Sequence, residues 1–419
     1  MSKVIGEGTY GCVHKPSLQC KNKKIDKKKV SKLMTHYHAN EELQEFDNIS
    51  RVDKNANYYL GMPDKCNPSS SRSNKRAINK CQDFTSKNIN DYSLLVMQDG
   101  GLTLEAFADK MQKMTKNTKS TKTMEMFWIE CHRLLFGLKE LMNNDIIHHD
   151  LKPLNIVYNE EQNRLNFIDF GFMTKISSIK EQAKQSNYPY AVSHWYFPFE
   201  FMLINYDDYI RISNKSIENR KDIIKKIMKN KDHKITTNMK IFYEESNNSK
   251  QFNLINTRNF YETILEINVD KYEDFLDNVL NTFDIYGLGI SFMHVLERTK
   301  HLISKSLYDI FNNLFSEMIT AKLENRIKID KLINDYEVIL ENEGLLRKYN
   351  YIFKKNKLKK REIPIINLVN DFVNNLRNMN VSKEEKESII HKEKPPTISK
   401  ITRKNKKLKK KNKTIKSPY

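Results

Sequence analysis

The sequence of 419 residues predicts an α+β fold in two lobes, on the basis of three observations. Short apolar runs alternate with turns across residues 3–60, a pattern typical of β-strands. Apolar residues recur at three- and four-residue spacing from Thr123 to Asn143, which predicts a core-facing helix. Between Pro198 and Gly287 the chain has no Gly or Pro, which favours helices throughout that stretch. A strand-rich beginning followed by a long helical remainder is typical of α+β proteins.

The first, smaller lobe is predicted to span residues 1–99. A helical stretch runs from Ala39 to Val52, and Asp91–Met97 is expected to be a buried strand because its last four residues are all apolar. Residues 61–90 are polar and rich in turn-forming residues, so we expect an inserted surface loop there.

The second lobe is predicted to span residues 100–345 and to be mainly helical, with two short strands around a turn between Ile146 and Phe170. Residues 346–393 are expected to form a helical extension. Residues 394–419 have too few apolar side chains to fold, which predicts a disordered basic tail.

The composition excludes some classes of protein. The net charge is +20 and 30% of the residues are charged, and no run approaches the ~18 apolar residues of a spanning helix, so we expect no membrane association. A glycine-rich motif begins at residue 6 and leaves no room for an apolar leader. Five Cys are few and odd in number, which favours a reducing compartment over a disulfide scaffold. We therefore expect a soluble, intracellular protein, with a nuclear location left open.

The first candidate site is a glycine-rich segment near the start of the chain. It consists of Ile5, Gly6, Glu7, Gly8, Thr9, Tyr10, Gly11, Cys12 and Val13. Glycines at this spacing let backbone amides approach phosphate oxygens closely. A dinucleotide-binding motif would need a helix directly afterwards, whereas a strand-like stretch follows. An ordinary hairpin turn is the alternative.

A second pair of motifs carries the groups that phosphoryl transfer requires. His148–Asn155 contains a carboxylate, a cation and an amide, and Asp169-Phe170-Gly171 begins fourteen residues after Asn155. The reaction needs a carboxylate to receive the hydroxyl proton, cations near the phosphates and oxygen ligands for Mg²⁺.

These motifs, in this order, resemble the eukaryotic-type serine/threonine protein kinase family over roughly residues 3–345. The resemblance implies a bilobal kinase fold with a small β-rich N-lobe and a larger helical C-lobe, ATP and Mg²⁺ as cofactors, and protein substrates. Asp150 is then the expected catalytic base, and Lys152 the partner of the transferred phosphate. Asn155 and Asp169 are the expected Mg²⁺ ligands.

Lys32 resembles the strand lysine that holds the α- and β-phosphates, although its neighbours depart from the usual Val-Ala-Ile-Lys. Lys28 and Lys29 stay open as alternatives. The ion-pair partner of this lysine is expected on the next helix. Glu45 fits best, because apolar residues then fall four and seven positions later and face the core, and Glu42 is the second choice.

Further residues resemble family positions that brace the catalytic loop. Glu200 ends the expected activation segment, with Ser193 as the hydroxyl that bonds the catalytic Asp and Lys. Asp284 resembles the start of the central buried helix, and Arg326 is expected to pair with Glu200. Glu200 and Asp284 are 84 residues apart, much farther than in the family, so an insertion of about residues 207–276 is predicted.

His149 replaces the arginine that in the family pairs with a phosphate on the activation loop. We therefore expect activity without loop phosphorylation, and a neutral, packed histidine is the simpler interpretation of the residue itself. Lys152 and Ser193 are typical of serine/threonine kinases. The short N-terminus and the residue bias are similar to those of protein kinases of giant DNA viruses.

Two features stay open. Cys20, Cys66 and Cys81 could bind Zn²⁺ with a nearby His, but no Cys-x-x-Cys pair is present, so free thiols are expected, with Cys131 in the core. The tail holds ten Lys and Arg and no acid between residues 400 and 416. It could bind nucleic acid or other polyanions, serve as a nuclear import signal, attract acidic substrates, or have no dedicated partner.

Two rival functions share the predicted fold. One is a catalytically weak pseudokinase that serves as a scaffold, and the other is a kinase of small molecules. A scaffold has no chemical need for Lys32, Asp150, Asn155 and Asp169 together. The peptide-docking segment from Trp195 to Glu200 favours protein substrates.

Overall fold

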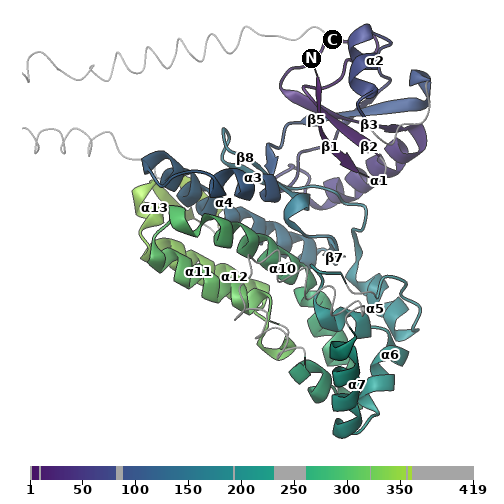
Figure 1. Cartoon of the computed structure of the whole chain (residues 1–419), viewed down its shortest axis with the longest axis vertical. Helices are drawn as coiled ribbons and strands as arrows, with labels where there is room; N and C mark the ends of the chain where they lie inside the picture. Colours follow the sequence, from purple (N-terminus) through teal and green to yellow (C-terminus); the bar gives the residue numbers. More distant parts are fainter. Residues whose placement is uncertain are drawn as a thin grey trace, which may run out of the picture. The chain divides into compact units, whose positions relative to one another are not determined.

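A computed structural model describes residues 2–8, 11–81, 88–191, 194–230, 261–320, 322–354 and 357–360. The chain divides into two compact units, residues 1–359 and 360–419. The first unit has an N-terminal β-sheet and a helical C-terminal part, which confirms the predicted α+β fold in two lobes (Figure 1).

The N-lobe is built on an antiparallel sheet with the strand order β1-β2-β3-β5-β4. Its strands are β1 (Lys3–Gly8), β2 (Gly11–Lys15), β3 (Lys29–Thr35), β4 (Asp64–Cys66) and β5 (Tyr92–Gln98). Strand β5 lies between β3 and β4 and is buried over its first five residues, as its apolar run predicts. The glycine-rich hairpin and strand β4 therefore lie at opposite edges of the sheet.

Helix α1 (His36–Val52) packs against this sheet and contains the predicted stretch Ala39–Val52. The Thr35 hydroxyl caps its N-terminus by accepting a hydrogen bond from the backbone N–H of His38. Ala39, Phe46 and Ile49 are buried, so these three residues mark the face that α1 turns toward the core.

The prediction of a surface loop for residues 61–90 was wrong in part. The segment supplies edge strand β4, helix α2 (Arg72–Ile78) and the start of the 3-10 turn η1 (Ile89–Asp91), and residues 82–87 lie outside the described residues. The Asn74 amide is buried and joins the segment to the backbone of Gln19 in both directions, at 3.1 and 2.8 Å. The polar composition predicted a loop in water, whereas the buried Asn74 amide is satisfied by backbone groups of the protein.

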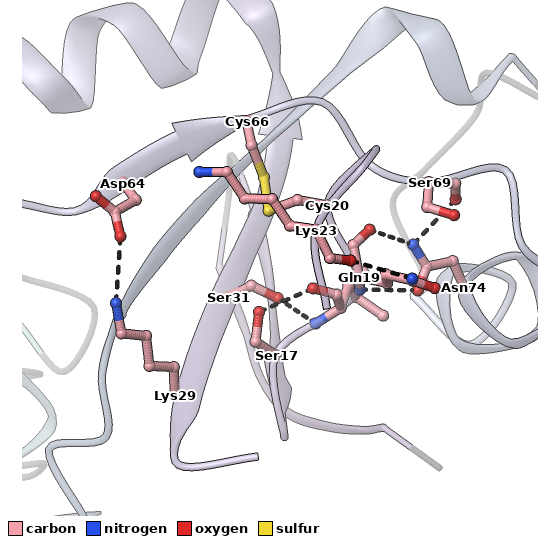
Figure 2. Close-up of a disulfide and its surroundings, with 11 residues drawn as sticks. Ser17, Gln19, Cys20, Lys23, Lys29, Ser31, Asp64, Cys66, Ser69 and Asn74 are labelled. Atoms are coloured by element: carbon pink, nitrogen blue, oxygen red, sulfur yellow. Dashed lines mark hydrogen bonds and ion pairs between the residues drawn. A yellow bond between two sulfur atoms is a disulfide. The ribbon is translucent and has the colours of Figure 1, made fainter. Parts of the chain in front are cut away.

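The expectation of free thiols was also wrong for Cys20, Cys66 and Cys81. Cys12 bonds Cys81 and Cys20 bonds Cys66 (the latter in Figure 2), while Cys131 is free and buried, as predicted. The partners are 69 and 46 residues apart, so no local spacing could reveal them. His14 Nε2 lies 3.7 Å from Cys81 Sγ, but sulfur atoms in a disulfide are not the thiolates that zinc requires.

The C-lobe begins with a small strand-bearing part next to the N-lobe. Its elements are β6 (Leu102–Thr103), α3 (Leu104–Gln112), α4 (Thr118–Asn143), β7 (Ile146–Ile147), η2 (Pro153–Asn155), β8 (Ile156–Asn159), β9 (Arg164–Phe167), β10 (Thr174–Lys175) and α5 (Ile176–Lys184). Strands β6, β8 and β9 form one sheet, and β7 pairs with β10. The catalytic-loop sequence lies between β7 and β8.

The described residues from Phe199 to Lys348 are mainly helical, as the lack of Gly and Pro before Gly287 predicts for the first part of this stretch. The elements of the stretch are η3 (Phe199–Leu203), α6 (Tyr206–Ser213), α7 (Ile217–Lys229), η4 (Val269–Lys271), α10 (Tyr272–Thr299), η5 (Lys300–Leu302), α11 (Lys305–Met318), η6 (Leu323–Asn325), α12 (Ile329–Asn342) and α13 (Leu345–Lys348). Helix α10 contacts α3, α4 and α11, and α12 packs on α4, which encloses the core around Trp128.

The sequence predicted that the central helix begins at Asp284. In the structure it begins twelve residues earlier, at Tyr272. No helix breaker precedes Asp284, so the helix continues back to Tyr272. Among the described residues, Val269–Leu302 has the length and composition of a membrane-spanning helix, but 94% of its most apolar window is buried inside the protein. It is the core helix of the lobe.

The two ends of the insertion predicted at residues 207–276 meet at one side chain. Arg220 on α7 is buried, and its guanidinium donates to the carbonyls of Ser213, Leu265 and Ile267. Residues 231–260 lie outside the described residues. The insertion therefore leaves and returns at nearly the same place.

The start of the expected helical extension contains a β-hairpin instead. Strands β11 (Tyr351–Lys354) and β12 (Lys357–Lys360) pair with each other, and Phe353 packs on the ring of His132 at 4.7 Å between centroids. Residues 361–419, which include the basic tail, lie outside the described residues.

Candidate active site

The catalytic loop is held in place by Asp284 from the middle of α10. Its carboxylate accepts the backbone N–H groups of His148, at 2.6 Å, and His149, at 3.0 Å. Burial raises the pKa of Asp284 to about 7, while these two hydrogen bonds act in the opposite direction. Asp284 therefore braces the loop as the resemblance implied.

The loop brings Asp150, Lys152 and Asn155 into direct contact. Asp150 Oδ2 accepts hydrogen bonds from Lys152 Nζ at 2.9 Å and from Asn155 Nδ2 at 2.6 Å. Because the Asn155 amide nitrogen is used in this way, its oxygen is the end that can bind a cation. Pro153 opens the short turn η2 that carries Asn155 back toward Asp150. The three residues expected to act together are therefore brought together.

Asp169 follows strand β9 and has a backbone φ of +64°, a conformation that is rare outside glycine. Its side chain is exposed, and the next residue, Phe170, is buried. The Phe170 ring lies 5.3 Å from the His148 ring and 5.8 Å from the Phe46 ring on α1. Packing of Phe170 between the two lobes thus holds the strained Asp169 backbone at the site.

Lys32 on β3 forms an ion pair with Glu42, so the prediction of Glu45 as its partner was wrong. Glu42 lies three residues after Ala39 and four before Phe46, on the stripe of α1 that faces the sheet. The sequence argument placed the register one turn too late. Of the alternative lysines, Lys28 is exposed and Lys29 pairs with Asp64 at 3.2 Å.

Glu45 lies near Asp169 and Gly171 instead. A Cβ on Gly171 would come within 3.4 Å of Glu45 Oε1. Partial burial, followed by the negative charges of Glu42 and Asp169, raises the pKa of Glu45 to about 7. The side chain is thus a second carboxyl near the expected metal ligand.

The glycine-rich segment is the hairpin between β1 and β2, in which Gly8 pairs with Gly11. Thr9 and Tyr10 lie outside the described residues. A Cβ on Gly11 would lie 2.9 Å from Lys32 Cε, whereas a Cβ on Gly6 or Gly8 would meet no described atom within 4 Å. Glycine at position 11 therefore lets the Lys32 stem pass, and the hairpin backbone stays open for a phosphate-bearing ligand. Cys12 and Val13 follow Gly11 on β2, where Val13 pairs with Lys32 of β3.

The sequence profile described as protein kinase domain matches residues 1–214, about half of the chain. The chain belongs to the protein kinase family. A relative, the serine/threonine-protein kinase prpf4B of Dictyostelium discoideum, is 38% identical over 77 residues, which is 18% of this chain and 9% of the relative. The chain therefore aligns with less than a tenth of the length of that curated relative.

Within this kinase, Tyr196 is a site residue that the motifs did not reveal. Lys152 Nζ lies 4.9 Å from the centre of the Tyr196 ring, and burial and the nearby Asp150 carboxylate raise the pKa of Tyr196. Ser193, the hydroxyl expected beside the catalytic Asp and Lys, lies outside the described residues. The aromatic run His194-Trp195-Tyr196-Phe197 was the available signal.

His149 is a buried, uncharged part of an aromatic cluster. Its ring centroid lies 4.9 Å from that of Phe283 and 5.3 Å from that of Phe197, and Tyr188 Oη lies 3.4 Å from Nε2. Burial lowers the pKa of His149 to about 4. At the position where the family has an arginine, this kinase thus has no cation at neutral pH.

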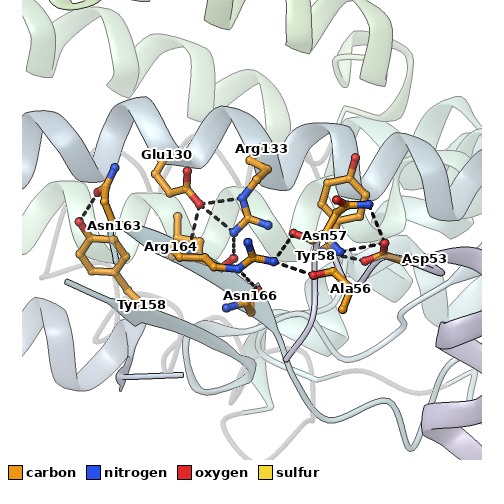
Figure 3. Close-up of polar contacts among 11 residues, drawn as sticks. Asp53, Ala56, Asn57, Tyr58, Glu130, Arg133, Tyr158, Asn163, Arg164 and Asn166 are labelled. Atoms are coloured by element: carbon orange, nitrogen blue, oxygen red, sulfur yellow. Dashed lines mark hydrogen bonds and ion pairs between the residues drawn. The ribbon is translucent and has the colours of Figure 1, made fainter. Parts of the chain in front are cut away.

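The two lobes of the kinase are tied together behind the site. Arg164 on β9 donates to the carbonyls of Ala56, at 2.6 Å, and Asn57, at 3.1 Å, in the segment after α1 (Figure 3). Asp53 at the end of α1 accepts the N–H of Tyr58 at 2.7 Å. These contacts fix the end of α1 and therefore support the position of Glu42.

Proposed function

We propose that the chain is an ATP- and Mg²⁺-dependent protein kinase that phosphorylates serine and threonine side chains. The observation that carries the proposal is the contact of Asp150 with both Lys152 and Asn155, together with the Lys32–Glu42 pair. A scaffold has no chemical need for this arrangement. Every group that phosphoryl transfer requires of the protein is present.

Each residue of the site has a role that follows from its chemistry. The Asp150 carboxylate is the acceptor for the proton of the substrate hydroxyl, and Lys152 stabilises negative charge that develops on the transferred group. Lys32, fixed by Glu42, would hold the α- and β-phosphates of ATP.

The donor atoms suit the expected cofactors. The Asn155 amide oxygen and the Asp169 carboxylate are hard oxygen ligands, which Mg²⁺ prefers, and they would hold the ion. When bound, Mg²⁺ neutralises phosphate charge. The open hairpin backbone at Gly6 and Gly8 would accommodate the phosphates.

Serine and threonine specificity is supported by Lys152, which tyrosine kinases usually replace, and by the name of the Dictyostelium relative. We further propose that the kinase needs no phosphate on its activation segment. A neutral His149 supports this proposal, because an uncharged ring cannot attract a phosphate. The same ring packs between Phe197 of the expected activation segment and Phe283 of α10. Intracellular action and a viral source stay predictions.

The test is a radiolabelled-ATP assay on the purified full chain with a mixed protein substrate, followed by phosphoamino-acid analysis. We expect Mg²⁺-dependent labelling of serine and threonine, and none with Asp150→Asn. Label only on tyrosine would contradict the specificity. Nucleotide binding without transfer would favour the pseudokinase, and transfer only to small hydroxyl compounds would favour the small-molecule kinase.

A further inference from the structure

Two segments of the N-lobe are joined into one unit by a disulfide. Residues 20–29 and 64–81, here named the basic platform, are joined by the Cys20–Cys66 disulfide (Figure 2). The N–H of Lys21 also donates to the carbonyl of Asn67 at 2.8 Å. The Cys12–Cys81 disulfide ties the end of the platform to β2. The platform is therefore fixed to the sheet at both of its ends.

The basic platform concentrates positive charge. It has eleven Lys and Arg against two Asp, Asp26 and Asp64. Ten of the cations are exposed: Lys21, Lys23, Lys24, Lys27, Lys28, Lys65, Arg72, Lys75, Arg76 and Lys80. Among the residues that the structure describes, Lys29 is the one platform cation that forms an ion pair, and its partner is Asp64. Within the described part of the lobe, the other platform cations thus have no ion-pair partner.

The other side chains of the platform decide which polyanion fits. Serines and asparagines lie between the cations, and these side chains, like Lys and Arg, commonly contact nucleic-acid phosphates. The platform sequence contains no aromatic residue on which a base could stack. The platform has one large exposed apolar side chain, Ile25, which is 44% exposed. One such side chain offers little apolar surface for insertion into a lipid membrane.

We propose that the basic platform binds the phosphate backbone of double-stranded nucleic acid without sequence preference. The disulfides hold the cation-bearing backbone before binding, which reduces the entropy lost on association. Cys66 of the platform lies on β4, at the edge of the sheet opposite the glycine hairpin, whereas Cys81 is bonded to Cys12 of β2. The platform therefore spans from the β4 edge to strand β2. Such a surface would bring a protein kinase to substrates that are themselves bound to nucleic acid.

The test uses the full chain and a short fluorescent duplex in two unrelated sequences, with affinity measured by anisotropy over a series of salt concentrations. One variant replaces Lys21, Lys23, Lys24 and Lys27 by Gln, and a second replaces Arg72, Lys75 and Arg76. A matched control replaces Lys221, Lys225, Lys226 and Lys229 on α7, which are also exposed. Replacing Lys406, Lys407, Lys409 and Lys410 measures the tail separately.

We expect each platform variant to weaken duplex binding at least about tenfold and to reduce the salt slope by about 0.9 for each phosphate that is no longer neutralised. The two sequences should bind equally, and the α7 control should bind like the native chain. Melting temperature and turnover on a short peptide should be unchanged, which separates loss of binding from loss of folding. Platform variants that bind like the control, or a native chain that prefers phosphatidylserine vesicles or polyglutamate to the duplex, would overturn the proposal.

Discussion

At the scale of single residues, Asp150 receives hydrogen bonds from two side chains and retains a carboxylate at the expected acceptor site. Asp150→Asn keeps the shape of the side chain but removes its capacity to take up a proton. We expect turnover to fall by ~10²–10⁴ while ATP affinity stays close to that of the native chain. Single-turnover kinetics and calorimetry measure the two quantities, and turnover within twofold of native would remove Asp150 from the role of base.

The two glutamates of α1 are predicted to differ sharply. Glu42→Ala breaks the pair with Lys32 and should reduce kcat/KM for ATP by roughly 10–100-fold, since hydrogen bonds to charged groups contribute about 1.5–3 kcal/mol. Glu45→Gln, which is not part of the pair, should remain within a few-fold of native. Steady-state kinetics with ATP varied tests both, and the opposite ranking would restore Glu45 as the partner.

His149 should make stability depend on pH. Its pKa is about 4 when folded and 6.5 for a histidine exposed to water, so the unfolded chain binds the proton first as pH falls. The contribution of His149 is complete above pH 6.5 and is lost between 6.5 and about 4, for a total of about 3 kcal/mol. Denaturant unfolding between pH 7 and 5 should show that the free energy of unfolding falls less steeply with pH in His149→Phe than in the native chain. Parallel declines in both proteins would assign the effect to other groups.

The limits of residue-level prediction have a physical cause. Asp150, Lys152 and Asn155 come together through a few consecutive residues, so their spacing alone predicted the contact. Choosing Glu42 rather than Glu45 required knowing which face of α1 is buried, and tertiary packing of Phe46 determines that face. Tyr196 reaches Lys152 from a distant segment, and the aromatic run around Tyr196 marked the segment but not this contact.

At the scale of elements, a buried ion pair joins η3 to the segment before α12. Arg326 Nη1 lies 2.6 Å from Glu200 Oε1, and the two side chains are 0% and 1% exposed. Arg326→Leu leaves Glu200 buried without its cation, so we expect a loss of about 3–5 kcal/mol in the free energy of unfolding. The double variant Glu200→Leu, Arg326→Leu should recover part of this loss. A single variant as stable as the native chain would show that the pair is dispensable.

Elements whose apolar residues recur with a regular spacing could be predicted from the sequence, whereas elements held by polar contacts could not. Helix α4 and strand β5 have apolar patterns that burial alone explains. Helix α2 is a mostly polar helix of seven residues, and the buried Asn74 amide fixes it to Gln19 beside a small apolar contact made by Ala77 and Ile78. Helix α10 begins early because no helix breaker precedes Asp284. The prediction followed the family resemblance and therefore placed the start at Asp284.

At the scale of the whole molecule, the two disulfides close nested rings in the covalent chain. The Cys12–Cys81 ring contains the Cys20–Cys66 ring, and it also contains β3 and α1 with Lys32 and Glu42. A cut after Lys23 leaves Cys12 and Cys20 on one piece and Cys66 and Cys81 on the other, so two covalent links still join the pieces.

Limited trypsin treatment should therefore cut the exposed lysine loop at residues 21–28 without separating the N-lobe. The pieces should migrate as one band on a gel without reductant and as two bands with it. Cys12→Ser or Cys20→Ser alone should leave them joined, and the double variant should release them. Separation of the native pieces without reductant would show that the rings are open. If the rings are closed, the N-lobe keeps its parts together after the exposed loop at residues 21–28 is cut.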